Sequence, residues 1–565
     1  MQTLLPGTLA HVRDLFLDFV DAATVEATVE ATEASTDGET EVARELLAKM
    51  RASLRGLDDD ALMLIAASAR EPALASEAIR LSAAIARLEP QRAAAWFAAG
   101  LALQFANRHA EALPPYRHAL AIQRTFPSLR NNLAGALVQV NIERNSREIL
   151  ALLEESVAAN PEDTNAWINL SRVLPTDTDI ARPLAAGRRA LALAPHSALA
   201  ANNYAMACRE AQQWDEAELA ARNACQYAPN DASMRLNLSM IQLMRGNFAE
   251  GWHGHEVRWQ GASELAGGRP AFPKPEWRGE PLAGRTLLVW GEQGKGDLLQ
   301  FCRYVPMLAE RVHREGGRLV WNSFPEMGAL LSRSLGGHCD LYCVGGPVAT
   351  LPTYDCEVSL LSLPLIFGTR EDTIPGPARY LAPDPAAAAR WRERLAGERR
   401  LKVGLAWTGS LTHKRNPFRR IGLEHFATQF AANFAAALPE VAFYSLQPGA
   451  GAEIEAVRKA GFEIADFSAE WRTFDDTAAF VDSLDLVISV CTSSAHLAGA
   501  LGRRTWVLLD VNPHWVWGLE RRDSPWYPHT TLYRQKRFRE WEPVLDEVSA
   551  DLAKLAGEHR AKQAR

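Results

Sequence analysis

The residues best suited to chemistry lie in two short segments of the second half of the chain. The first covers residues 291–297, reads Gly-Glu-Gln-Gly-Lys-Gly-Asp, and follows an apolar run at 285–290. A glycine-rich turn between a strand and a helix lets the backbone approach a ligand and directs helix-terminal N–H groups at it. It is not a Walker loop, because no Gly-Lys-Ser/Thr follows at the required spacing. Asp297 either serves the chemistry or caps a helix expected to start near Leu298.

Three hydroxyl side chains form the second segment. Thr492, Ser493 and Ser494 follow an apolar run at 484–490, and a helix is expected to begin near Ala495. Their hydroxyls and the first helical N–H groups would form an anion site that needs no metal. Plain capping of the helix uses the same residues and is compatible with that role.

An α/β fold must position these segments. Short apolar runs alternate with helical stretches over residues 283–550, with glycine at the junctions. Two such series predict two Rossmann-like lobes, at 283–390 and 398–558, with ligands at the carboxyl ends of the strands. A helix near 541–555 is expected to cross back to the first lobe. The expected strands are 285–290, 318–321, 340–344, 355–360, 401–407, 441–447, 484–490 and 505–509.

The first half of the chain carries a 34-residue repeat of helical composition. A tryptophan follows two of the repeat prolines by six residues, and alanines recur where a second helix would pack. This is the tetratricopeptide (TPR) pattern, in which the proline ends one helix pair and small residues allow close packing. We predict an all-α solenoid at 89–262 after a helical region at 1–88. Pro127, Pro161, Pro195 and Pro229 are spaced by 34 residues, and Pro90 precedes them at a spacing of 37.

Asparagine recurs with the same period. Asn169, Asn203 and Asn237 each lie eight residues after a repeat proline, in the helix that would line the concave groove. A row of carboxamides offers a donor and an acceptor at every step, which suits the backbone of an extended peptide. The alternative is a consensus residue that only covers the helix surface, since Ala98 and Gly135 occupy this position in earlier units.

The order of these segments resembles bacterial TPR-fused, family-9-like glycosyltransferases, relatives of heptosyltransferases with the two-lobed GT-B fold. The asparagine row resembles the ladder of O-GlcNAc transferase, and the repeat-plus-transferase architecture resembles flagellin glycosyltransferases. The matching segments are 294–304 (GKGDLLQFCRY), 360–364 (LLSLP), 403–407 (VGLAW), 445–447 (SLQ), 489–501 (SVCTSSAHLAGAL) and 523–527 (DSPWY).

The resemblance implies roles for several residues. Asp297 matches the family's general base, which deprotonates the attacking hydroxyl. The lobe at 283–390 would be the acceptor side, and the lobe at 398–558 would be the donor lobe, which holds a nucleotide sugar without metal. One departure from the family is Cys491, where the family usually has an acid. Trp515, Trp517, Trp526 and Tyr527 either stack on the nucleobase or form core. The implied donor-binding residues are Lys414, Arg415, Gln447, Thr492, Ser493, Ser494 and His496, with Arg419 and Arg420 as further cations.

Composition narrows the class of protein. The net charge of −7 argues against binding of nucleic acid through the overall charge of the protein. No apolar run approaches the roughly 18 residues of a membrane span. Seven scattered cysteines indicate reduced thiols, and Cys339 and Cys343 beside His338 make a poor zinc site. No Asp-x-Asp motif ends a strand, so we expect no metal or other cofactor. We expect a cytoplasmic location.

These observations predict a glycosyltransferase that modifies a Ser/Thr hydroxyl of a protein docked by the repeats, with flagellin as a candidate acceptor. One alternative is a peptide-binding scaffold whose transferase half has decayed, as Cys491 and Lys295 would suggest. Another is transfer to a glycan or lipopolysaccharide.

Overall fold

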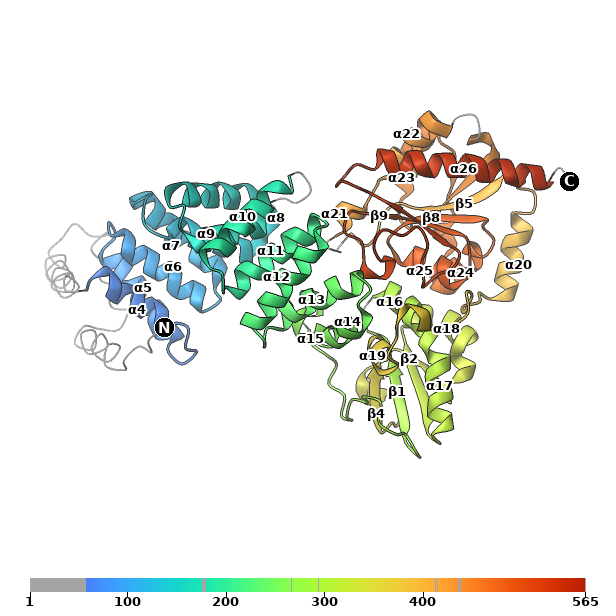
Figure 1. Cartoon of the computed structure of the whole chain (residues 1–565), viewed down its shortest axis with the longest axis horizontal. Helices are drawn as coiled ribbons and strands as arrows, with labels where there is room; N and C mark the ends of the chain where they lie inside the picture. Colours follow the sequence, from blue (N-terminus) through green and yellow to red (C-terminus); the bar gives the residue numbers. More distant parts are fainter. Residues whose placement is uncertain are drawn as a thin grey trace, which may run out of the picture. The chain divides into compact units, whose positions relative to one another are not determined.

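The computed structural model describes residues 57–174, 179–265, 267–292, 294–411, 413, 415–434 and 438–563 (Figure 1). The helical region expected at 1–88 is therefore described only from residue 57. The chain forms two compact units, one of residues 1–175 and 181–207 and one of residues 176–180 and 208–565.

The first unit consists of helical hairpins with the predicted period. Trp96 Nε1 donates to the carbonyl of Pro90 at 3.1 Å, and Trp167 Nε1 donates to that of Pro161 at 2.9 Å. The tryptophan thus fastens each helix to the proline turn before it, which explains the six-residue spacing. Ala112 is fully buried where two helices meet. The helices are α4 (Asp59–Ser68), α5 (Ala75–Leu88), α6 (Ala93–Phe105), α7 (His109–Ile122), α8 (Leu129–Ala159, interrupted at Asn141), α9 (Thr164–Val173), α10 (Ala181–Leu193) and α11 (Ala198–Glu210), whose last turn belongs to the second unit.

The second unit begins with the last repeats. Ala217 and Ala224 are fully buried, as the small-residue pattern predicts. The helices here are α12 (Trp214–Tyr227), α13 (Ala232–Met244), α14 (Phe248–His255) and α15 (Arg258–Gly261).

A four-stranded parallel sheet forms the first lobe, with strand order β3-β2-β1-β4. Strands β1, β2 and β4 are largely buried, as expected of a parallel sheet covered by helices, whereas the edge strand β3 exposes Leu341 and Val344. The carboxyl end of the central strand β1 leads into α16, the helix that carries Asp297. The elements are β1 (Thr286–Trp290), β2 (Arg318–Ser323), β3 (Leu341–Val344), β4 (Cys356–Ser359), α16 (Lys295–Phe301), α17 (Val305–Arg314), α18 (Gly328–Leu335) and α19 (Leu363–Ile366).

A six-stranded parallel sheet forms the second lobe, with strand order β10-β9-β8-β5-β6-β7. All eight predicted strands exist, and the fold class is confirmed: a TPR region followed by two Rossmann-like lobes. The elements are β5 (Leu401–Ala406), β6 (Val441–Ser445), β7 (Ile464–Ala465), β8 (Leu486–Val490), β9 (Thr505–Leu509), β10 (Thr530–Arg534), α20 (Pro385–Arg394), α21 (Asn416–Arg419), α22 (Leu423–Phe434), α23 (Gly451–Lys459), α24 (Phe474–Val481), α25 (Ser493–Ala500) and α26 (Glu542–Gln563).

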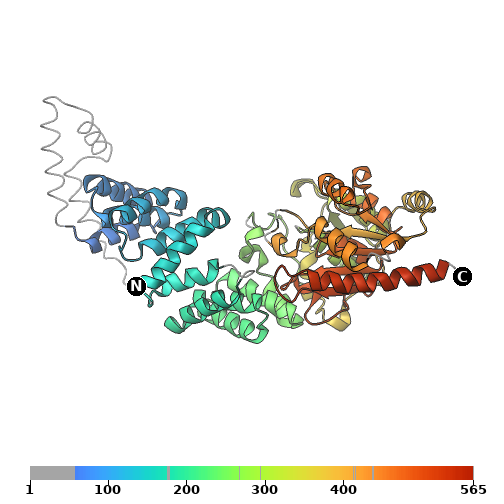
Figure 2. The same cartoon turned by 90° about the horizontal axis from the view of Figure 1, so that it is seen from above.

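Two expectations about the lobes are wrong. The C-terminal helix α26 packs along α22 and β10 of the second lobe and does not cross back. Figure 1 shows this red helix beside α22 and away from β1 and β4, and Figure 2 shows the same helix from above. The end of the first lobe, predicted at residue 390, falls inside helix α20, which packs on α24 of the second lobe with the ring centroids of Trp391 and Phe480 4.8 Å apart. In both cases the apolar face of the helix buries itself against the nearest helices of the second lobe.

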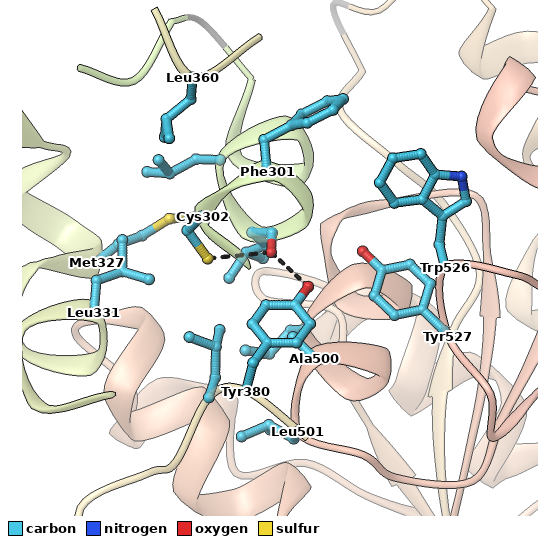
Figure 3. Packing of buried hydrophobic residues seen from close by; sticks show 14 of the residues in the cluster. Phe301, Cys302, Met327, Leu331, Leu360, Tyr380, Ala500, Leu501, Trp526 and Tyr527 are labelled. Carbon is cyan, nitrogen blue, oxygen red and sulfur yellow. Dashed lines mark hydrogen bonds between the residues drawn. The ribbon is translucent and has the colours of Figure 1, made fainter. Parts of the chain in front are cut away.

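One hydrophobic core connects the last repeat with both lobes. Trp252 of α14 packs edge-on against Trp515 with ring centroids 5.1 Å apart, and its Nε1 donates to the carbonyl of Thr369 at 3.0 Å. Figure 3 shows the centre of this core, where Tyr380 donates to the carbonyl of Leu299 at 2.7 Å beside residues of both lobes. The boundary predicted near residue 262 therefore separates sequence patterns but cuts through a single folding unit.

We expect Trp252→Ala to destabilise the second unit by about 3–5 kcal/mol, because it removes a buried aromatic ring from a core that cannot refill the space. Denaturant unfolding followed by tryptophan fluorescence measures this. Leu219→Ala, at a position that is 62% exposed on α12, is the control and should change stability by less than about 0.5 kcal/mol. A Trp252→Ala transition as stable as the control would show that the last repeat is separable from the lobes.

Candidate active site between the two lobes

Asp297 lies in the first turn of α16, directly after the turn that leaves β1. Gly294 is the N-cap residue, with a left-handed φ of 100°, and a Cβ at this position would overlap Asp297 Oδ2. Only glycine fits such a position without strain. The helix begins at Lys295, so the alternative in which Asp297 caps a helix starting near Leu298 is wrong.

The carboxyl group of Asp297 is half-buried and accepts no hydrogen bond from the residues that the structure describes. Burial raises its pKa from 3.8 to about 7, and the nearby charge of Glu292 adds to the effect. A carboxyl group with a pKa near neutrality can accept a proton from a hydroxyl far better than an ordinary surface aspartate.

The neighbouring charge is held by a buried ion pair. Arg258 of α15 donates from Nε to both carboxylate oxygens of Glu292, at 2.9 and 3.1 Å, and also bonds Ser362 Oγ at 2.9 Å. Ser359, at the end of β4, donates to the same carboxylate. Burial acts to lower the pKa of Arg258, but its hydrogen bond to Glu292 and the carboxylate charges leave it raised. Sequence reasoning passed over Glu292, although it lies inside the glycine-rich segment.

The predicted anion site lies at the carboxyl end of β8. Thr492 is the N-cap residue of α25, but its side chain makes no capping hydrogen bond. Ser493 and Ser494 follow in the first turn, and all three side chains are partly exposed. The backbone N–H groups of these two serines donate to no partner within the described chain. The N-terminus of α25 is thus open to an anion.

The two candidate segments face each other, because α16 packs against α25. A Cβ added to Gly296 would lie 3.1 Å from His496 Cδ2. His496 is buried, and its Nδ1 is 2.8 Å from the hydroxyl of Tyr527. Burial lowers its pKa to about 3, with further lowering by His514, Arg303 and Arg419, so the ring is neutral at pH 7.

The aromatic cluster beside this histidine is core. Trp517, Trp526 and Tyr527 are at most 1% exposed and Trp515 is 4% exposed. The nucleobase-stacking alternative for these four residues is therefore wrong, since no ring face is open to a ligand. Cys491 is buried with them, and its Sγ accepts a hydrogen bond from Trp517 Nε1 at 3.1 Å.

A cationic side chain from the loop after β5 reaches the anion site. Arg419 donates from Nη1 to the carbonyl of Cys491 at 2.8 Å, directly before Thr492. Arg415 is instead paired with Glu210 at 3.0 Å and Asp510 at 3.4 Å. Lys414 lies outside the described residues. Arg419, which sequence analysis ranked behind its neighbours, is the arginine that the structure brings to α25.

Gln447 follows β6 at the same edge of the second sheet. It is half-buried, and its backbone N–H donates to Ser445 Oγ at 3.1 Å. β6 is separated from β8 by β5, so the side chain lies at the carboxyl edge but two strands from the anion site. Its contact with base or ribose stays a prediction.

The asparagine row makes contacts within the repeats. Asn169 Nδ2 donates to Asn131 Oδ1 at 2.7 Å, and Asn203 Nδ2 donates to the carbonyl of Ile168 at 2.9 Å. Asn203 is only 8% exposed, whereas Asn237 in the second unit is half-buried. The amide hydrogens of Asn169 and Asn203 thus connect adjacent helices. This favours, for these amide groups, the alternative in which the asparagines are consensus residues of the repeat rather than peptide-binding residues.

Three comparisons place the chain among known proteins. No family model matches it. It is 29% identical to protein FlbA of Caulobacter vibrioides over 454 residues, which cover 75% of this chain and 72% of FlbA. A thermophilic TPR protein of Thermus thermophilus covers 31% of the chain at 17% identity (94% of that protein, TM-score 0.27). A family-9 glycosyltransferase of Veillonella parvula covers 51% of the chain at 10% identity (all of that protein, TM-score 0.37).

No described helix is both long enough and apolar enough to cross a membrane. Among the same residues, no group of three or more His, Cys, Asp or Glu side chains has an arrangement that could hold a metal ion.

The raised pKa of Asp297 predicts how stability depends on pH. The folded protein binds the proton more tightly than the unfolded chain, so stability is lost as the pH rises from about 4 to about 7 and Asp297 must ionise. Asp297→Asn removes that charge. We expect the variant to exceed the wild type by roughly 1–3 kcal/mol at pH 8 and to match it near pH 4.

Urea unfolding between pH 4 and pH 8 measures this difference. Asp372→Asn, at an exposed position of the same lobe, should show no such trend. An Asp297→Asn protein that is no more stable than the wild type at pH 8 would mean that Asp297 titrates like an ordinary aspartate.

Proposed function

We propose that the chain is a glycosyltransferase that moves a sugar from a nucleotide-sugar donor to a hydroxyl group. One observation carries the proposal: the unpaired carboxyl of Asp297, with its pKa near neutrality, lies where α16 meets α25 and its open, anion-binding N-terminus. A transferase needs these two functions within reach of one bound donor, namely a base for the attacking hydroxyl and positive dipoles for the leaving phosphate.

Each group has a separate task in the reaction. Asp297 takes the proton from the hydroxyl as its oxygen attacks the anomeric carbon. The bond from that carbon to the phosphate oxygen breaks, and negative charge develops on the leaving phosphate. The N–H groups of Ser493 and Ser494 and the hydroxyl of Thr492 stabilise this charge together with Arg419. The mechanism uses no metal, and neutral His496 supports the site through its bond to Tyr527.

We propose a Ser or Thr side chain of a protein as the acceptor, docked by the TPR region, with flagellin as the first candidate to test. The support is the architecture, since TPR solenoids present extended surfaces that bind peptides. Asn169, Asn203 and Asn237 are the proposed acceptor-binding residues. A glycan or lipopolysaccharide acceptor would leave the repeats without a role in the reaction.

A non-catalytic scaffold is the competing function, and Cys491 is the observation that favours it. Its thiol is directed at the indole of Trp517 inside the core, so it cannot take over a donor contact from an acid. Against this, the base and the phosphate-binding turn remain together. The first test is calorimetry with UDP, GDP, CMP and dTDP. A protein that binds none of them would be a scaffold.

Asp297→Asn tests the chemical step. Asparagine keeps the size of the side chain but cannot accept a proton at neutral pH, so we expect transfer to slow by about 10²–10⁴-fold. Donor affinity should barely change, because the donor is held by the second lobe. The wild-type kcat/KM should rise with pH and level off above about pH 7.

Transfer rates and nucleotide Kd values for both proteins provide the measurement, with Asp372→Asn as control. Near-normal transfer by a folded Asp297→Asn protein would exclude this residue as the base.

Changing Asn169, Asn203 and Asn237 together to Ala tests the acceptor site. We expect binding of flagellin to weaken by at least about tenfold, since several hydrogen bonds to the acceptor backbone are lost. Nucleotide Kd should stay the same. Because Asn169 and Asn203 also bond Asn131 and the carbonyl of Ile168, the unfolding transition of the triple variant is measured alongside its binding. Unchanged flagellin modification in the triple variant would assign the row to helix packing alone.

A further inference from the structure

We infer that Glu210, the last residue of the repeat helix α11, is a positioning residue of the donor site in the second lobe. The inference rests on the proposed function, because it concerns the loops proposed to hold the nucleotide sugar. It goes beyond the modular interpretation, in which the repeats serve the acceptor and the α/β lobes serve the donor.

The carboxylate of Glu210 is buried and binds two loops of the second lobe. Its Oε1 accepts from Arg415 Nη1 at 3.0 Å and from Asn512 Nδ2 at 2.8 Å, and Arg209 Nη2 is also at 3.0 Å. All four residues belong to the second unit. Burial acts to raise the pKa of Glu210, but the charges of Arg415 and Arg209 leave it below its usual value, so the group is ionised.

Through Arg415, Glu210 is connected to Arg419, the cationic side chain at the anion site. Arg415 precedes the short helix α21, and Arg419 ends it one turn later, where it donates to the carbonyl of Cys491 at 2.8 Å. Asn416 secures this helix to the end of β5, because its Oδ1 accepts from the backbone N–H of Gly409 at 2.9 Å. A Cβ on Gly409 would overlap the guanidinium of Arg419, so the fit is close.

Through Asn512, Glu210 is connected to β9, the strand next to β8 and its anion site. Asn512 lies in the loop after β9, and its backbone N–H donates to Asp510 Oδ1 at 3.0 Å. Val490 of β8 pairs with Leu508 of β9, so Asp510 continues β9 level with Thr492. Asp510 also faces Arg415 at 3.4 Å. Glu210 therefore connects the loops that follow β5 and β9, on either side of the turn that starts α25.

The charge balance explains why an acid is required at this position. Arg415 is half-buried, its Nε is shielded from solvent, and a guanidinium withdrawn from water without a full partner is destabilising. Without Glu210 it would keep only the longer contact with Asp510, and α21 would shift with it. Arg419 would then lose its geometry at Cys491, and a displacement of about 1 Å in such a group can cost up to 10²-fold in function.

Glu210→Gln is the test, because it removes the charge and keeps the size. The probe is whichever of UDP, GDP, CMP and dTDP binds the wild-type full-length chain most tightly, measured by calorimetry. We expect Kd to rise about ten- to a hundredfold in Glu210→Gln and less in Glu210→Asp, which keeps the charge. Glu216→Gln, on the exposed face of the next helix, is the matched control and should stay within about twofold.

A double-mutant cycle separates positioning from a general loss of stability. If Glu210 acts through Arg415, adding Arg415→Gln to Glu210→Gln should change Kd by less than the product of the two single effects. Independent effects that multiply, or a Glu210→Gln protein with wild-type Kd, would overturn the inference and leave the proposed function intact. A wild-type protein that binds none of the four nucleotides would overturn both.

Discussion

The buried ion pair between Arg258 and Glu292 is the interaction on which the second unit depends. It brings a residue of the last repeat to the turn after the central strand of the first lobe. Removing water from two charges is costly, and only close geometry with added hydrogen bonds offsets that cost. Ser359, Ser362 and Glu256 supply those bonds. The pair therefore demands that α15, β4 and the glycine-rich turn occupy one arrangement, and that arrangement sets the position of α16.

The same ion pair places the carboxylate of Glu292 beside Asp297, and Arg258 contacts Glu292 rather than Asp297. Arg258 satisfies Glu292, and within the described chain no donor satisfies Asp297. Glu292 is thus stabilised by an ion pair, whereas the charged form of Asp297 is destabilised. Stability is lost at this position, which is the exchange expected at an active site if Asp297 is the proposed proton acceptor. Gly294 shows the same constraint in the backbone, since a larger residue would overlap the carboxyl group.

Much of the fold followed from local patterns, and the failures have physical reasons. Buried parallel strands are continuous apolar runs, so eight of them could be predicted, but β7 has two residues and β10 is half polar (Thr-Thr-Leu-Tyr-Arg). The sequence predicts the start of α16 three residues late, because a glycine at position 294 is typical of a loop and its φ is not evident from the sequence. Asp297 and the Thr492–Ser494 turn could be found from their spacing after strands. The partners of Arg415 could not, because Glu210 lies 205 residues away in the chain.

Long-range charged contacts also change what the repeat region means for the proposed reaction. A solenoid that only presented an acceptor could be joined to a transferase by a linker, and few buried groups would cross the junction. Here Trp252, Arg258 and Glu210 each bury a polar or charged atom against residues of the lobes. Such atoms cannot be exposed or exchanged without leaving an unpaired partner. The last helices of the solenoid and the two lobes therefore form one structure, and under the proposed function these helices are part of the site.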